Sequence, residues 1–327
     1  MDVHLASGRD ESFRWGTIGA VSVAVLLVNL RAYDDLERCL QALNPHLEPA
    51  DEVVIVDYES DDLQLQRVMA QCPRASAVVR ADNRGFAAGV NLAATLSRAR
   101  FLLLLNPDTE LLGPVPRILR EWLTVHPETG VVGPRLLNAD GSLQPSARSF
   151  PGLSTVFAGR STWLTRTFPH NWLSRRNMPG GSTRQPVDVD WVSGACLMTP
   201  REVFDRLHGL DESFFLYWED ADYCRRATAA GQRVTYVPIV TARHTGGACA
   251  RHALARAIGE FHRSASYLYW KHRLPPGRLF SPLVRAGLYL RGRMCLHRAL
   301  RNRMAADRRP SHAVVHEAPV RQPSESL

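Results

Sequence analysis

Residues 101–108 read Phe-Leu-Leu-Leu-Leu-Asn-Pro-Asp, five apolar residues followed at once by three turn formers. A run this short and this apolar is typical of a strand buried on both faces, and the turn formers mark where that strand ends. The same arrangement recurs at residues 21–29 and 52–57, which end in Asn29 and Asp57. Strands buried on both faces occur in parallel sheets, which bind ligands outside the carboxyl ends of their strands. The three stretches therefore predict an α/β fold with a binding edge at these strand ends.

Segments of helical periodicity alternate with the strands. Residues 34–43, for example, carry their apolar side chains at the spacing of a helix that packs on a sheet. Alternation at this pace predicts βαβ units and a Rossmann-like, mostly parallel sheet flanked by helices. The predicted strands are residues 21–29, 52–57, 100–105, 130–133, 190–198 and 233–237, and the predicted helices are residues 34–43, 85–97, 114–126, 200–207 and 219–230.

Residues 138–188 break this alternation. They are rich in Gly, Pro, Ser and Arg, and a connection this long rarely lies idle inside a compact domain. We therefore predict that the segment is a substrate-covering or mobile loop.

Composition indicates a soluble protein with reduced thiols. Hydrophobic residues make up 45% and charged residues 22% of the chain, which is ordinary for a globular domain. The six cysteines lack the close spacing of metal or disulfide frameworks, which favours a cytoplasmic location. No apolar run approaches the ~18 residues that cross a bilayer. The apolar stretch 18–30 has no signal-peptide cleavage site, so we read it as the first strand.

Positive charge is concentrated in one segment. The whole chain carries a net charge of +8, whereas residues 251–309 hold fourteen basic and two acidic residues. Such a segment indicates an anionic partner, and because no nucleic-acid recognition signature accompanies it, we predict no nucleic acid. After Pro282 a helix would place Leu283, Leu290 and Met294 on one face. That helix either lies on an anionic membrane or packs on the protein core.

Three carboxylates, Glu219, Asp220 and Asp222, follow directly after an aromatic run at residues 214–218. Like charges this close repel unless a cation is near or one of them takes up a proton. The apolar lead-in favours a partly dry site, where a carboxylate acts as a general base. The alternative is the acidic first turn of a helix, which the helix dipole explains by itself.

Asp108 and His244 are candidate ligands of a divalent metal. The chain lacks a Gly-rich phosphate cradle, so the phosphates of a nucleotide would need a cation. Mg²⁺ requires only one or two carboxylates besides phosphate oxygens. The alternatives are a plain Asn-Pro-Asp turn and a structural histidine.

Taken together, these stretches resemble glycosyltransferase family 2, and most closely its bacterial rhamnosyltransferase-like branch, in which Asn-Pro-Asp replaces Asp-x-Asp. The order in which so many motifs recur is far more specific than any one of them. The resemblance implies a GT-A fold and an inverting, metal-dependent transfer of a sugar from a nucleotide. Two departures are Tyr58, where the family usually has Asn, and Asn106, which offers a neutral oxygen in place of a carboxylate. The matching residues are Val28-Asn29, 54–57, 83–91, 104–108, 192–198, 209–215, 219–226 and His244.

The resemblance also implies a role for individual residues. Asp57 would accept the N–H of a uracil or thymine base, and Asp220 would be the general base, with Glu219 beside it and Arg226 as a counter-charge. Asp108 and His244 would hold Mg²⁺ or Mn²⁺ on the diphosphate. The remaining nucleotide-sugar site would consist of Asn29, Asn83, Gly89, Asn91 and Asn106, of which Asn83 and Asn91 have the alternative of fixing loops only. The acceptor site would consist of Trp191, Gly194, Ala195 and Asp222.

The resemblance further divides the chain into parts. We expect a flexible N-terminus at 1–17, a GT-A catalytic domain at 18–250, a basic helical extension at 251–306 and a disordered tail at 307–327. Within the catalytic domain, 18–137 would be the nucleotide-binding half and 138–250 the acceptor half.

The expected function is sugar transfer in cell-surface polysaccharide synthesis. L-rhamnose from dTDP-rhamnose is favoured over another UDP- or dTDP-sugar, and the acceptor is a glycan or a polyprenyl-diphosphate-linked glycan. Such an enzyme would work in the cytoplasm or on the inner face of the plasma membrane. Of the rivals, a nucleotidyltransferase would need a Gly-rich loop near the first strand, and a non-catalytic binding relative would not need Asp108, Asp220 and His244 together.

Overall fold

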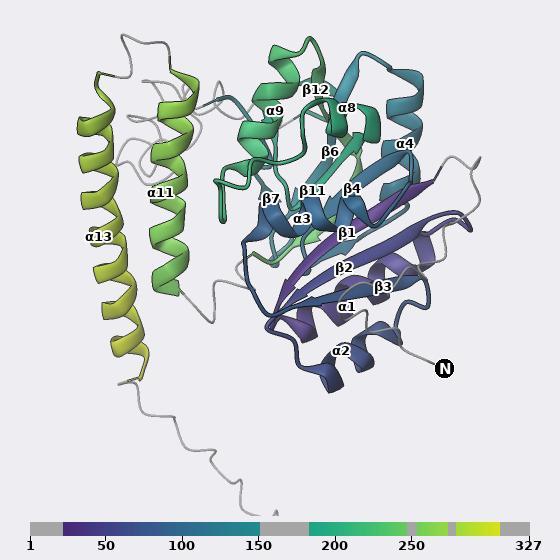
Figure 1. The fold of residues 1–327 in the computed structure, drawn as a ribbon, viewed down its shortest axis with the longest axis horizontal. Helices are drawn as coiled ribbons and strands as arrows, with labels where there is room; N and C mark the ends of the chain where they lie inside the picture. Colours follow the sequence, from purple (N-terminus) through teal and green to yellow (C-terminus); the bar gives the residue numbers. More distant parts are fainter. Residues whose placement is uncertain (1–21, 151–182, 247–253, 274–278, 308–327) are drawn as a thin grey trace, which may run out of the picture.

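The computed structural model describes residues 22–150, 183–246, 254–273 and 279–307, which form one large sheet covered by helices (Figure 1). The strand order is β3-β2-β1-β4-β11-β6-β12-β5, with β7 beside β6 and β9 beside β12. A small second sheet pairs β10 with β8. The strands are β1 (Val23–Leu30), β2 (Glu52–Tyr58), β3 (Ala75–Arg80), β4 (Phe101–Leu105), β5 (Thr109–Leu111), β6 (Thr129–Leu137), β7 (Leu143–Gln144), β8 (Ala147–Arg148), β9 (Val187–Asp188), β10 (Trp191–Val192), β11 (Cys196–Pro200) and β12 (Arg233–His244).

The N-terminal half of the sheet is parallel, as the apolar runs predict. β1 pairs in parallel with both β2 and β4, and β2 pairs in parallel with β3. The register places Asn29 directly beside Asp57, so two of the predicted site residues meet at one sheet edge. The C-terminal half is mixed, because β11 runs antiparallel between β4 and β6 while β12 is parallel to β6.

Helices cover both faces of the sheet and create two cores. The side chains of β1 alternate between them: Val23, Val25 and Leu27 join one core, and Ala24, Leu26 and Val28 join the other. This is the period of two that a strand buried on both faces requires. The first core lies under α1 (Tyr33–Leu43), α2 (Asp62–Met69) and α4 (Val115–Val125), and the second lies under α3 (Phe86–Thr95), α8 (Arg201–Arg206) and α9 (Glu219–Ala229). A short 3-10 helix, η1 (Asn44–His46), follows α1.

Several local predictions differ from the structure. β6, for example, runs from Thr129 to Leu137, beyond the predicted strand at 130–133. The stretch 190–198 is split into β10 and β11 by a turn at Ser193–Ala195, because Ser193 N–H donates to Ser146 and directs the chain away. β12 continues past the predicted end at residue 237 to His244, after an irregularity in its register. α2 and β3 were not predicted, because β3 is only half-buried and shows no strong apolar run.

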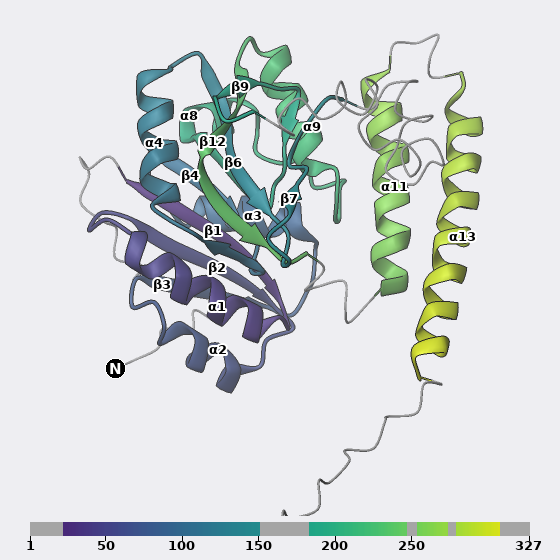
Figure 2. The same cartoon turned by 180° about the vertical axis from the view of Figure 1, so that it is seen from behind.

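The basic extension consists of two helices, α11 (Leu254–His272) and α13 (Ser281–Asp307). In both views α11 lies between the catalytic domain and α13 (Figure 1 and Figure 2). Leu268 of α11 is buried in the second core, so α11 packs on the catalytic domain. None of the described helices is long and apolar enough to cross a membrane. The predicted N-terminus at 1–17 and the tail beyond Asp307 lie outside the described residues, as do residues 151–182 of the predicted covering segment.

Candidate active site

The ends of β1 and β2 form the side of the site that was predicted to bind the nucleotide of the sugar donor. Asn29 Nδ2 donates to Asp57 Oδ1 at 2.7 Å, and Tyr33 Oη donates to Asp57 Oδ2 at 3.0 Å. Burial raises the pKa of Asp57, while these hydrogen bonds act in the opposite direction. A hollow of about 910 Å³ opens beside this cluster and is lined by Tyr33 and its neighbours. Because the Asp57 side chain is itself fully buried, a base could reach its oxygens only after Tyr33 or Asn29 moved.

Three other residues that were predicted to bind the nucleotide-sugar make contacts within the protein. Asn83 Oδ1 accepts from Gly85 N–H at 3.0 Å, which is the loop-fixing contact left open by the sequence. The Asn91 amide bonds both backbone groups of Leu210, at 2.9 Å each, and so ties α3 to the acceptor half. A Cβ on Gly89 would lie 2.7 Å from Val28, so this glycine lets α3 approach β1 closely.

Asp108 and His244, the predicted metal ligands, lie together. Asp108 Oδ1 is 3.2 Å from His244 Nε2. The opposite ring nitrogen, Nδ1, lies 2.8 Å from Gln144 Oε1. Because the Gln144 amide nitrogen already donates to the His244 carbonyl and to Asn138, its oxygen must accept, so Nδ1 carries the proton. In the neutral imidazole with this tautomer, Nε2 would turn a lone pair toward the Asp108 carboxylate.

Two lone pairs at this distance need a proton or a cation between them. The 3.2 Å separation is close to that of two neighbouring ligands on one octahedral ion with bonds of about 2.1 Å. The Asn106 amide nitrogen lies 3.4 Å from the same Nε2, and a flip of that amide would bring its oxygen there. In the described part of the chain, no group of three or more His, Cys, Asp or Glu residues is placed to hold a metal. Two protein ligands fit Mg²⁺ or Mn²⁺ bound mainly by a diphosphate.

The turn at Ser193–Ala195 joins the predicted metal ligands' side of the site to the predicted base, Asp220. The Ala195 carbonyl accepts from Asn106 N–H at 3.0 Å, and Gly194 N–H donates to Asp220 Oδ2 at 2.9 Å. A Cβ on Gly194 would lie 3.2 Å from the Asp220 Cβ, which is tighter than ordinary contact. Trp191, just before the turn, is buried against Trp218 with ring centroids 6.0 Å apart. The predicted acceptor residues Trp191, Gly194 and Ala195 are thus gathered around Asp220.

Glu219 and Asp220 have different surroundings. Asp220 accepts from the backbone N–H groups of Gly194 and Ala221, at 2.9 and 2.8 Å. Burial raises the pKa of Asp220, while these donors and the charge of Arg148 act in the opposite direction. Burial, followed by the charge of Asp220, raises the pKa of Glu219 well above its ordinary value. Within the described residues, Glu219 Oε2 has no hydrogen-bond partner. The two carboxyl groups therefore differ: two backbone N–H groups favour the charged form of Asp220, whereas burial without a partner at Oε2 favours the protonated form of Glu219.

α9 begins at Glu219, so the carboxylates do lie in the first turn of a helix. The helix dipole accounts for this position but not for the burial of Glu219, which is 6% exposed. The two residues before it, Tyr217 and Trp218, have φ angles of 70° and 73°, which side chains with a Cβ rarely adopt. Strained backbone of this kind persists where surrounding contacts hold it, commonly at functional sites.

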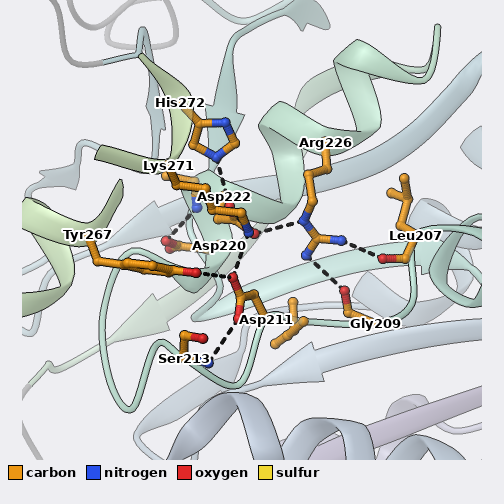
Figure 3. Close-up of polar contacts among 12 residues, drawn as sticks. Leu207, Gly209, Asp211, Ser213, Asp220, Asp222, Arg226, Tyr267, Lys271 and His272 are labelled. Atoms are coloured by element: carbon orange, nitrogen blue, oxygen red, sulfur yellow. Dashed lines mark hydrogen bonds and ion pairs between the residues drawn. The ribbon is translucent and has the colours of Figure 1, made fainter. Parts of the chain in front are cut away.

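Asp222 lies in an ion-pair cluster, shown in Figure 3. Its side chain is fully buried; Oδ1 accepts from Lys271 and His272 at 2.7 Å each, and Oδ2 accepts from Arg226 at 2.8 Å. Burial alone would raise the pKa of Asp222, but the hydrogen bonds from His272 and Lys271 and the charge of Arg226 lower it. Arg226, predicted as a counter-charge at the base Asp220, pairs instead with Asp222. The contact of Asp222 with an acceptor stays a prediction, because the partners that the structure shows for its oxygens are side chains of the protein itself.

Sequence reasoning missed four residues that shape the site. Tyr33 and Gln144 orient Asp57 and His244, and no motif distinguishes either one. Lys271 and His272 reach Asp222 from the extension. One signal was available for Lys271, which is the only lysine of the chain.

The fold and this group of residues define a glycosyltransferase. The chain belongs to the glycosyltransferase-like family 2, whose model matches residues 20–264. It is 29% identical over 288 residues to the N-acetylglucosaminyl-diphospho-decaprenol L-rhamnosyltransferase of Mycobacterium tuberculosis. This match covers 81% of this chain and 90% of that relative. It is 26% identical to the low-salt glycan biosynthesis hexosyltransferase Agl10 of Haloferax volcanii, over 68% of this chain and 66% of the relative.

Solved structures support the GT-A fold. The mannosyltransferase PcManGT of Pyrobaculum calidifontis, in complex with GDP-Man and Mn²⁺, matches with a TM-score of 0.53 and 18% identity, over 88% of this chain and 76% of that one. GalNAc-T7 with UDP, GalNAc and Mn²⁺ has the same TM-score at 14% identity, over 72% of this chain and 44% of its own. The predicted family, fold and enzyme class are confirmed.

Proposed function

We propose that this glycosyltransferase moves L-rhamnose from dTDP-rhamnose, with inversion at the anomeric carbon, onto a polyprenyl-diphosphate-linked glycan. The names of the relatives support the sugar and the acceptor class. The observation that carries the proposal is the turn at Ser193–Ala195, which bonds Asn106 on the metal side and Asp220 on the base side at once. In this proposal, one turn links the side that would hold the leaving group to the side that would hold the attacking hydroxyl.

The residues present fit a divalent metal on the donor diphosphate. Asp108 and His244 would hold it, with Gln144 fixing the imidazole so that Nε2 is free to bind. When bound, the ion would offset the charge that develops on the departing diphosphate. Asn29 and Asp57 mark the nucleoside end of the same site.

Proton transfer falls to Asp220. An acceptor hydroxyl attacks the anomeric carbon, the bond from that carbon to the diphosphate oxygen breaks, and the hydroxyl proton passes to Asp220. dTDP leaves with the electron pair of the broken bond. Burial raises the pKa of Glu219 well above its ordinary value, and in its protonated form Glu219 would add no second negative charge beside the base.

The outer helix α13 gives the protein a face suited to a membrane. Leu283, Leu290 and Met294, the predicted stripe, are 71%, 63% and 57% exposed. Arg291 and Arg293 flank the stripe and are exposed as well. An interfacial helix buries such a stripe among headgroups while its arginines meet anionic lipid. We propose that α13 brings the site to a lipid-linked acceptor at the inner leaflet of the plasma membrane.

A transfer assay tests the reaction. Purified protein, Mg²⁺ and an N-acetylglucosaminyl-diphospho-polyprenol are incubated in turn with dTDP-rhamnose, dTDP-glucose, UDP-glucose and UDP-N-acetylglucosamine, and products are read by mass spectrometry. Turnover with dTDP-rhamnose at least ten times faster than with the others is expected. Preference for another donor would reject the rhamnose assignment and retain the transferase.

Vesicle flotation tests the membrane face. A truncation after Arg273 removes α13 and keeps α11, which packs on the core; a cut after Ala250 would remove both and damage the catalytic domain. Intact protein should float with phosphatidylglycerol vesicles at low salt and less at high salt, whereas the truncated protein and Leu283→Ser/Leu290→Ser should not float. Equal flotation of all three would reject the role of α13.

A further inference from the structure

The loop that leads into α9 contacts α11 at both of its ends and between them. The loop runs from Asp211 to Trp218, directly before Glu219 and Asp220. Its α11 partners follow at helical spacing along one face. They are Phe261 against Tyr217 and Trp218, Ser264 donating to the Leu216 carbonyl, Tyr267 against Phe214 and Asp211, and Lys271 against Asp211.

Lys271 ends this face and links the start of the loop to the catalytic helix. Its ammonium lies 2.6 Å from Asp211 Oδ2 and 2.7 Å from Asp222 Oδ1 (Figure 3). His272 adds a second contact to the same Asp222 oxygen at 2.7 Å. An ammonium is a compact charge with three donors, which suits the space between two carboxylates better than a planar guanidinium. In a chain that otherwise uses arginine throughout, the one lysine stands here.

The loop needs such support because its last two residues are strained. Tyr217 and Trp218 adopt positive φ angles, a conformation that costs on the order of 1–3 kcal/mol per residue and persists only when neighbours impose it. On one side, the Phe215 carbonyl accepts from Phe86 N–H at 2.8 Å. On the other side, the ring of Phe261 in α11 meets the Tyr217 ring edge-on and the Trp218 ring at a tilt, with centroids 5.7 and 5.3 Å apart. The strained end of the loop is therefore flanked by α3 on one side and by α11 on the other.

We propose that α11 is a positioning element of the active site, and that Lys271 and His272, acting through Asp222, hold the loop so that Asp220 faces the acceptor hydroxyl. The proposal rests on the proposed function of Asp220 as the base. It assigns Lys271 and His272 no contact with substrate.

Kinetics of Lys271→Met, with Lys271→Arg and Arg263→Met beside it, test the proposal. Arg263 is the matched control because it is an α11 cation whose partner, Glu260, lies on the same helix. Lys271→Met should lower kcat about 10–100-fold, since small displacements of a catalytic group have effects of that order. The affinity for dTDP, measured by calorimetry, should stay within about twofold, because Lys271 does not touch the donor side. Lys271→Arg should recover part of kcat, and Arg263→Met should match the wild type.

A substrate-free measurement separates this proposal from the proposed function. Hydrogen exchange of residues 211–222 should rise in Lys271→Met and stay unchanged in Arg263→Met. Ser264→Ala, a mild change, should raise exchange near Leu216 and serves if Lys271→Met does not fold. If the wild type transfers no sugar, the function has failed, and exchange still decides whether α11 holds the loop. A normal kcat in Lys271→Met, or equal loss of kcat and dTDP affinity, would overturn the positioning role.

Discussion

The contrast between Asp220→Asn and Glu219→Gln tests the assignment of the two buried carboxylates. Both oxygens of Asp220 accept backbone N–H groups, from Gly194 and Ala221. An asparagine amide would turn its NH₂ toward one of these donors and leave it unsatisfied, which costs about 1–3 kcal/mol. Glutamine, by contrast, closely imitates a protonated Glu219. We therefore expect Asp220→Asn to melt several degrees lower than the wild type and Glu219→Gln to melt within a degree or two of it.

The kinetic effects should differ in the same direction. Asp220→Asn removes the base and should lower kcat about 10²–10⁴-fold while dTDP binding is kept. Glu219→Gln should retain activity within about tenfold, since the neutral form is preserved. Wild-type activity should fall as the pH decreases, because protonated Asp220 cannot act as a base. Since burial raises the pKa of Asp220, the midpoint of this fall should lie above about 3.9, the ordinary pKa of an aspartate. Retention of turnover and pH profile in Asp220→Asn, or an equal loss in Glu219→Gln, would refute the assignment.

Three further predictions follow from single contacts. A chelator should abolish transfer, Mg²⁺ or Mn²⁺ should restore it, and Asp108→Asn or His244→Gln should weaken metal-dependent dTDP binding in calorimetry; full activity in chelator would refute the metal role. Gly89→Ala forces a methyl group against Val28 and should cost about 1–3 kcal/mol in urea unfolding, partly restored by Val28→Ala; an unchanged midpoint would show that α3 shifts freely. Although burial acts the other way, hydrogen bonds from the Lys271 ammonium and from Ser213 lower the pKa of Asp211 to about 2, so the stabilisation that they give is present above pH ~4 and lost as the pH falls toward 2. Unfolding of Asp211→Asn against the wild type should show a difference that shrinks over that window, and a constant difference would refute it.

Much of the fold could be predicted from the sequence because its parallel strands are buried on both faces. The apolar runs at 21–29, 52–57 and 100–105 predict β1, β2 and β4. The polar residues at their ends indicate that ligands bind at the carboxyl ends of these strands. β3 was missed because an edge strand that is only half-buried carries no such run. The split of 190–198 was missed because the contact that turns the chain comes from Ser146, far away in the sequence.

The candidate site was predictable where a motif carries the chemistry, and not where a partner comes from a distant element. Asp108 and His244 lie together because β5, which begins at Thr109 directly after Asp108, pairs with the end of β12 at His244; their role as metal ligands stays a prediction. The pairing of Asp211 with Lys271 spans 60 residues and joins a loop to a helix that was expected to be a separate extension. Apolar periodicity reports burial but not which carboxylate a buried cation will meet.

The single lysine gives the protein a natural reporter for chemistry in solution. Lys271 carries the only side-chain amine of the chain, and that amine lies against two carboxylates, with 23% of its side chain exposed. Amine-specific labelling reagents modify free, deprotonated amines, so reaction at Lys271 should be slow while α11 is docked and fast once it releases. Labelling followed by peptide mass spectrometry would thus report, at one residue and without any mutation, how often α11 separates from the loop at residues 211–218.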